Sequence, residues 1–237
     1  MFSFVPAMQH ILNNPIYNAL VTGNSHLAQG GGAVKYFPME ISPFAGLEIL
    51  DEPSFSQLAA MLPYGRIVAC ITAAVPAISP EWKMLKQEVI LQMTGEHIVL
   101  PNTHISGIVP LNKTHVPQML ALTKLTNPGP FLERTIEFGH YHGIFNGPQL
   151  AAMAGYRLHA GQYVEISAVC TNPNFLGHGY AAGLMLYLAQ TIMAKGNTPF
   201  LHVRADNERA IGLYKRLGFA IRSDMNLNII ENGTNTL

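Results

Sequence analysis

A glycine pair between an apolar strand-like run and an apolar helical pattern is the segment of this sequence best suited to hold a ligand. Residues 174–181 read Asn-Phe-Leu-Gly-His-Gly-Tyr-Ala, which places Gly177 and Gly179 two apart. The apolar run 163–170 precedes them, and the helical pattern continues to Lys195. A helix N-terminus offers unpaired N–H groups and a positive dipole end, and glycine lets a phosphate approach the backbone. The segment therefore predicts a site for a phosphorylated cofactor.

Two other patterns resemble a phosphate loop and a metal site, and each has a simpler explanation. Gly30–Gly32 looks like a phosphate loop, but it precedes a strand-like run and opens no helix, which favours a linker. His140 and His142 lie two apart, on one face of an expected strand. A zinc centre needs three or four ligands, so we expect no metal, and the two histidines could instead line an acceptor pocket.

Regular elements in the second half of the chain must position the glycine pair. Around it we expect a strand over 163–170, a helix over 178–195 closed by Gly196, a strand over 200–204, a helix over 208–217 closed by Gly218, and a strand from 219. Upstream we expect a helix over 116–125, strands over 133–138, 142–145 and 150–158, and a hairpin turn at Asn146-Gly147. The polar tail 226–237 is expected to fray in part.

The first half of the chain is less regular, which predicts a domain boundary near residue 112. Its expected elements are helices over 8–20 and 54–62 and strands over 33–37, 66–75, 87–94 and 104–111. Residues 1–112 would form an N-terminal α/β lobe, and residues 113–237 a second domain. No residue-by-residue repeat relates the two halves.

Composition describes an enzyme-like body. Of the 237 residues 49% are hydrophobic and 12% charged, against about 25% charged in an ordinary domain. Fourteen basic and fourteen acidic residues cancel, and no basic run suits nucleic acid. Cys70 and Cys170 lie in apolar runs, which favours a reducing compartment over a disulfide framework. No secretory leader or run of about 18 apolar residues is present, so we expect a cytoplasmic protein without a membrane partner.

Two ordered motifs in the second half resemble those of a known family. Residues 165–185, EISAVCTNPNFLGHGYAAGLM, look like the acetyl-CoA motif of the GNAT superfamily of N-acetyltransferases. Residues 207–219, NERAIGLYKRLGF, resemble the motif that follows it, one helix and one strand later. The resemblance covers residues 114–222, and the segment 128–131 is similar to a two-lobed branch that includes glycine N-acyltransferase-like proteins. It implies an α/β fold with a mixed, splayed central sheet flanked by helices, preceded by a degenerate GNAT-like lobe.

The resemblance implies a set of cofactor-binding residues. Backbone amides near Ala168 or Val169 would polarise the thioester carbonyl, and the strand ending at Cys170 would pair with the pantetheine arm. The pyrophosphate would lie on the backbone N–H groups of Leu176, Gly177, His178, Gly179, Tyr180 and Ala181. The family often carries arginines here. Because this loop has none, the diphosphate would be held almost entirely by backbone.

Catalytic roles follow from the same resemblance, and each has an alternative. Tyr214 would protonate the CoA thiolate, or it is a core aromatic residue. Asn207 would contact pantetheine, cap its helix, or do both. Glu165 would be the general base, or the partner of a basic side chain such as Arg157.

The acceptor side is the least determined part of the sequence. Phe131, Glu137, His140 and His142 are candidate substrate residues, with Glu137 also a second candidate base. The resemblance implies direct transfer of acetyl, or another acyl group, from acyl-CoA to a small-molecule or peptide amine by a monomer or homodimer. The alternatives are a CoA-binding sensor or structural protein that has lost the chemistry, and a nicotinamide enzyme that uses the glycine pair, for which a third glycine is missing.

Overall fold

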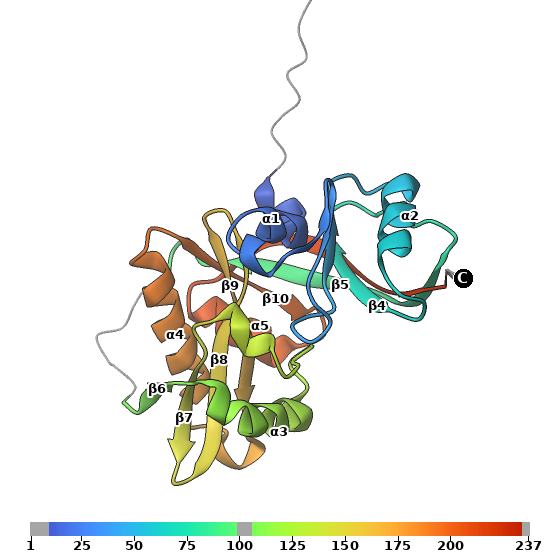
Figure 1. Cartoon of the computed structure of the whole chain (residues 1–237). Helices are drawn as coiled ribbons and strands as arrows, with labels where there is room; N and C mark the ends of the chain where they lie inside the picture. Colours follow the sequence, from blue (N-terminus) through green and yellow to red (C-terminus); the bar gives the residue numbers. More distant parts are fainter. Residues whose placement is uncertain (1–9, 99–105, 234–237) are drawn as a thin grey trace, which may run out of the picture.

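A mixed eight-stranded sheet is the centre of the protein (Figure 1), in a computed structural model that describes residues 10–98 and 106–233. Its strand order is β4-β11-β5-β10-β9-β8-β7-β6, and every neighbouring pair is antiparallel except β9 and β10. The strands are β4 (Ile67–Thr72), β5 (Trp82–Thr94), β6 (Ile108–Pro110), β7 (His142–Asn146), β8 (Gln149–Ala160), β9 (Tyr163–Thr171), β10 (Thr198–Arg204) and β11 (Ala220–Asn232). A second, three-stranded sheet joins β1 (Gln29–Gly31), β2 (Val34–Tyr36) and β3 (Ala45–Leu47).

Helices cover both faces of the large sheet. The helices are α1 (Pro15–Val21), α2 (Glu52–Met61), α3 (Val116–Thr126), α4 (Tyr180–Met193) and α5 (Glu208–Arg216). Buried residues of α1 and α3 share one hydrophobic cluster, and those of α4 and α5 share another with the opposite face of β8 and β9. A third cluster packs α2 against β4 and the small sheet. The expected mixed α/β fold is confirmed.

The sheet parts where β9 meets β10. These two parallel strands pair only over Tyr163 to Glu165 and Thr198 to Phe200. Beyond that point β9 contains a bulge, because Ala168 has a φ of +52° and the β8–β9 register shifts beside it. Ile166 packs with the α4 cluster whereas Ala168 packs on the α1 side, so the bulge reverses the alternation of side chains. The result is a splayed sheet, as expected.

One element prediction was wrong. Residues 133–138 contain the short 3₁₀ helix η4 (Thr135–Phe138), which ends because Gly139 and His140 both adopt positive φ. Residues 226–232 of the tail belong to β11, because they pair with β5 on one side and, as far as Glu231, with β4 on the other. The end of the tail lies outside the described residues. The expected strand 104–111 lies partly outside the described residues, and β6 occupies its end.

Both halves of the chain contribute to the central sheet. β5 comes from the first half and lies between β10 and β11 of the second. The helices predicted over 178–195 and 208–217 are confirmed as α4 and α5, and the first helix starts only at Pro15. The division of the chain at residue 112 stays a prediction about domain organisation. Within the described ranges no helix is long and apolar enough to cross a membrane.

Candidate active site

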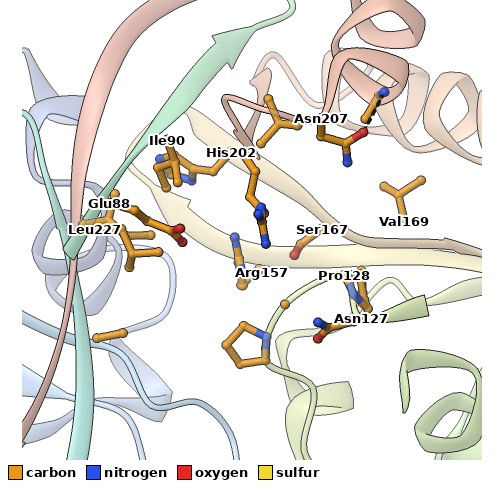
Figure 2. Close-up of a pocket in the computed structure, with 18 of the residues that line it drawn as sticks. Glu88, Ile90, Asn127, Pro128, Arg157, Ser167, Val169, His202, Asn207 and Leu227 are labelled. Carbon is orange, nitrogen blue, oxygen red and sulfur yellow. Dashed lines mark hydrogen bonds between the residues drawn. The ribbon is translucent and has the colours of Figure 1, made fainter. Parts of the chain in front are cut away.

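A cavity of about 510 Å³ opens where β9 and β10 part (Figure 2). One side is formed by residues 166–169 of β9, by β10 and by the start of α5. The opposite side comes from β4, β5 and β11, and the loop 127–130 after α3 closes a third side. Residues from both halves of the chain therefore line one space.

Tyr214 and Asn207 reach this cavity from α5. Tyr214 is 9% exposed, and burial raises its pKa to about 12, so the hydroxyl holds its proton at neutral pH. The Asn207 side chain accepts a hydrogen bond from the Ala210 N–H at 3.1 Å, which makes it the N-cap of α5. Of the two explanations for Asn207, the cap is confirmed, and the residue also lines the cavity.

Glu165 is fully buried and forms a bidentate ion pair with Arg157. The Arg157 Nε and Nη2 atoms donate to its two oxygens at 2.8 and 2.6 Å. Burial alone would raise the Glu165 pKa, but Arg157 and then His202 outweigh it and lower the pKa to about 2. The alternative role, partner of Arg157, is therefore confirmed. A carboxylate this acidic and enclosed is a poor direct base, because general bases work best with a pKa near the operating pH.

His202 of β10 connects this pair to a buried hydrogen-bond network. Its Nδ1 atom lies 2.7 Å from Glu165 Oε1, and its Nε2 atom lies 3.0 Å from Gln92 Nε2. The Gln92 oxygen accepts from Arg222 at 2.7 Å, so the Gln92 nitrogen is the donor to His202. In this arrangement the His202 Nδ1 atom donates to Glu165. Both of its nitrogens are used, which leaves neither available to a substrate.

The glycine loop lies outside the cavity, on the surface at the start of α4. Gly177 and Gly179 have φ values of +85° and +75°, conformations that favour glycine. The helix begins at Tyr180, so the N–H groups of its first turn have no partner inside the helix. The Leu176 N–H, one of the expected donors, already donates to the Pro173 carbonyl at 3.4 Å. The His178 Nδ1 atom lies 3.1 Å from the Phe175 carbonyl, so this ring faces its own loop.

The remaining residues singled out from the sequence are divided between the cavity and other places. Ala168 and Val169 line the cavity, whereas Cys170 is buried, and burial raises the pKa of its thiol to about 12. Phe131 packs edge-on against Tyr141 at 5.5 Å, and Glu137 pairs with Arg134 at 2.8 Å. None of Cys170, Phe131 and Glu137 lines the cavity.

His140 and His142 do not share a strand face as expected. His140 precedes β7 with a φ of +53° and stacks on Tyr156 at 4.4 Å, where it lines a separate cavity of about 200 Å³. His142 begins β7, and its ring lies 4.8 Å from that of Tyr187. Across residues 10–98 and 106–233 no three His, Cys, Asp or Glu side chains are grouped to hold a metal.

Four cavity residues on β5 and β10 were not predicted from the sequence: Lys86, Glu88, His202 and Arg204. One signal was available for the β5 pair. Lys86, Glu88 and Ile90 alternate along a strand, which places two charged side chains and an apolar one on the same face. Nothing in the sequence says that this face meets β9 and α5.

The comparisons with known proteins agree with this architecture. A family model for FR47-like proteins matches residues 141–227. A solved structure from Novosphingobium aromaticivorans DSM 12444, assigned as an acetyltransferase of the GNAT family, has a TM-score of 0.87 and 32% identity, covering 95% of this chain and 100% of its own. A GCN5-related N-acetyltransferase from Kribbella flavida shares the fold alone, with a TM-score of 0.58, 12% identity and coverage of 94% and 96%. No curated protein matches the chain.

A splayed mixed sheet with a cavity at the parting strands, and a relative of 32% identity over nearly the whole chain, define an acyltransferase fold. The chain belongs to the GNAT family of acetyltransferases. The resemblance of the two sequence motifs to this superfamily is thereby confirmed.

Proposed function

We propose that this protein transfers an acyl group, most simply acetyl, from acyl-CoA to a primary amine by direct attack, without a covalent enzyme intermediate. The observation that carries the proposal is the parting of β9 from β10 over a cavity that Tyr214 and Asn207 reach. Beyond Glu165 the backbone edge of β9 is not paired with β10, so it is available to a pantetheine arm.

The roles of the cavity residues follow from their surroundings. Backbone amides at Ala168 and Val169 lie at the bulge, where a thioester carbonyl could be polarised. Tyr214, protonated at neutral pH, would give its proton to the departing thiolate. The first turn of α4, from Gly179 to Ala181, would hold the pyrophosphate through backbone N–H groups.

Several finer points belong to the same proposal. The chain would work in the cytoplasm as a monomer or homodimer, on a small-molecule or peptide amine, without nucleic acid, membrane or metal. Membership of the two-lobed branch similar to glycine N-acyltransferases, with residues 1–112 as a degenerate GNAT-like lobe, is also proposed.

The test is a calorimetric titration with acetyl-CoA and CoA, followed by a thiol-release assay over a panel of amines. We expect acetyl-CoA to bind and at least one amine to release CoA thiol. Failure of acetyl-CoA and CoA to bind would contradict the proposal.

The second candidate is a CoA-binding sensor of the same fold. The observation in its favour is the glycine loop, where His178 faces its own carbonyls and the loop residues 174–181 include no lysine or arginine. Binding of acetyl-CoA without thiol release for any amine would support the sensor.

A further inference from the structure

Strands β4, β11 and β5 form a continuous floor on one side of the cavity. Leu227 pairs with Ile71 on one side and with Glu88 on the other. Because directly paired residues point to the same face of a sheet, these three side chains form one row across the floor. The next row contains Ala69, Ile229 and Lys86 by the same register, and all six residues line the cavity.

Glu88 is the acidic group of this floor. Figure 2 shows its side chain extending from β5 into the cavity. Its side chain is 24% exposed, and its ion-pair partner is Lys86, at 2.7 Å and 48% exposed. Such a solvent-facing pair contributes little to folding and is readily exchanged. An incoming ammonium group can therefore take the place of Lys86 beside this carboxylate.

Each cationic side chain that lines the cavity already has a carboxylate partner. Arg157 is held by Glu165 at 2.6 Å, and Arg204 by Asp206 at 2.6 Å. Lys86 pairs with Glu88. The rest of the floor around Glu88 is aliphatic.

We propose that Glu88 binds the ammonium group of the acceptor and takes its proton, and that the aliphatic floor holds an apolar body that carries this amine. This inference rests on the proposed N-acyltransferase function. The general base would then be Glu88 on β5, in the first half of the chain, and not Glu165 on β9.

The proposed reaction is a direct transfer from sulfur to nitrogen. The acceptor ammonium gives one proton to Glu88, and the freed nitrogen lone pair forms a bond to the thioester carbonyl carbon. The carbon–sulfur bond breaks, and the thiolate takes a proton from Tyr214. The proton that the new amide nitrogen sheds returns to the tyrosinate, and Glu88 releases its proton to water.

The experiment uses 2-phenylethylamine as the probe and the full chain saturated with CoA. Calorimetry measures its binding to the wild type, to Glu88→Gln and to Glu231→Gln. Glu231 is the matched control, because it forms a similar Glu–Lys pair, with Lys83 at 3.6 Å, on the same sheet but outside the cavity. We expect Glu88→Gln to weaken binding by about ten-fold or more, and Glu231→Gln to leave it within about two-fold.

A second variant, Lys86→Met, distinguishes a loss of the Glu88 contact from a damaged fold. Lys86→Met removes the competing ammonium, so it should tighten 2-phenylethylamine binding, a gain that a damaged fold cannot produce. With acetyl-CoA, Glu88→Gln should lower kcat/KM for 2-phenylethylamine by about 100-fold.

The possible failures are distinguishable. If CoA and acetyl-CoA do not bind, the proposed function fails and this inference with it. If the wild type acetylates 2-phenylethylamine but Glu88→Gln behaves like Glu231→Gln, only the role of Glu88 is overturned.

Discussion

Glu165 on β9 and Glu88 on β5 lie near opposite sides of one cavity, in contrasting surroundings. Glu165 is 0% exposed, is bound by Arg157 through two hydrogen bonds and has a pKa lowered to about 2. Glu88 lines the cavity, and its partner is a single exposed lysine. The first carboxylate is committed to the fold, whereas the second is free to exchange partners. Burial and number of partners, more than proximity to the parting strands, therefore separate a structural acid from a candidate catalytic one.

The largest expected effect tests the structural side of this comparison. Glu165→Gln leaves Arg157 buried without its counter-charge, so the free energy of unfolding should fall by about 3–5 kcal/mol. Chemical denaturation measures it. Glu88→Gln is the contrast, with a change below about 1 kcal/mol. Equal losses of stability in Glu165→Gln and Glu88→Gln would contradict the structural role of Glu165. The double variant Arg157→Met/Glu165→Gln should recover part of the stability lost in Glu165→Gln.

The pH dependence of stability separates the carboxylates in a second way. The folded pKa of Glu165, about 2, lies below its ordinary value of 4.5. As the pH falls through that window the unfolded chain binds the proton first, so the stabilisation is complete above the window and is lost within it. The loss is on the order of 3 kcal/mol, at about 1.4 kcal/mol per pKa unit. Denaturation at several pH values should show this component in the wild type and in Glu88→Gln but not in Glu165→Gln.

The next effect concerns Tyr214, on the α5 side of the cavity. Tyr214→Phe removes the proposed acid and keeps the buried ring, so kcat should fall by about 100-fold while the acetyl-CoA dissociation constant stays nearly constant. Steady-state kinetics with a reactive amine and calorimetry measure the two quantities. An unchanged kcat at saturating substrate would contradict the role of the acid and leave Tyr214 as a core aromatic.

The smallest effect separates the two roles of Asn207. Asn207→Ala removes the N-cap of α5 and should cost about 1 kcal/mol of stability. Asn207→Asp keeps an oxygen acceptor for the Ala210 N–H, so it should restore the stability. If both variants bind acetyl-CoA weakly, the Asn207 amide contacts the cofactor. If Asn207→Asp restores acetyl-CoA binding together with stability, Asn207 acts only as the helix cap.

Much of the fold could be predicted because its signals are local. The glycine pair, the strand that became β9, and helices α4 and α5 with their caps all follow from periodicity and glycine chemistry within about ten residues. The weaker predictions depend on pairing. The sequence predicts a strand over 133–138, where the structure has η4. The polar residues 226–232 are ordered in β11 only because neighbouring strands pair with them.

The site residues that could be predicted are likewise those whose signals are local. Tyr214, Asn207 and the β9 residues Ala168 and Val169 were found because their motifs are contiguous in the chain. Glu88 was not, because β5 reaches the cavity only by pairing with β10, a strand more than a hundred residues later. The sequence also left Glu165 undecided between base and ion-pair partner.

The sequence by itself determined the family motifs, the glycine turn at the start of α4 and the cap of α5, since each depends on neighbouring residues and backbone conformation. Only the tertiary structure decided which carboxylate is enclosed and which faces the cavity. Burial is set by strands distant in sequence: His202 of β10 lies 37 residues beyond Glu165, and β11 of the second half supplies the floor beside Glu88.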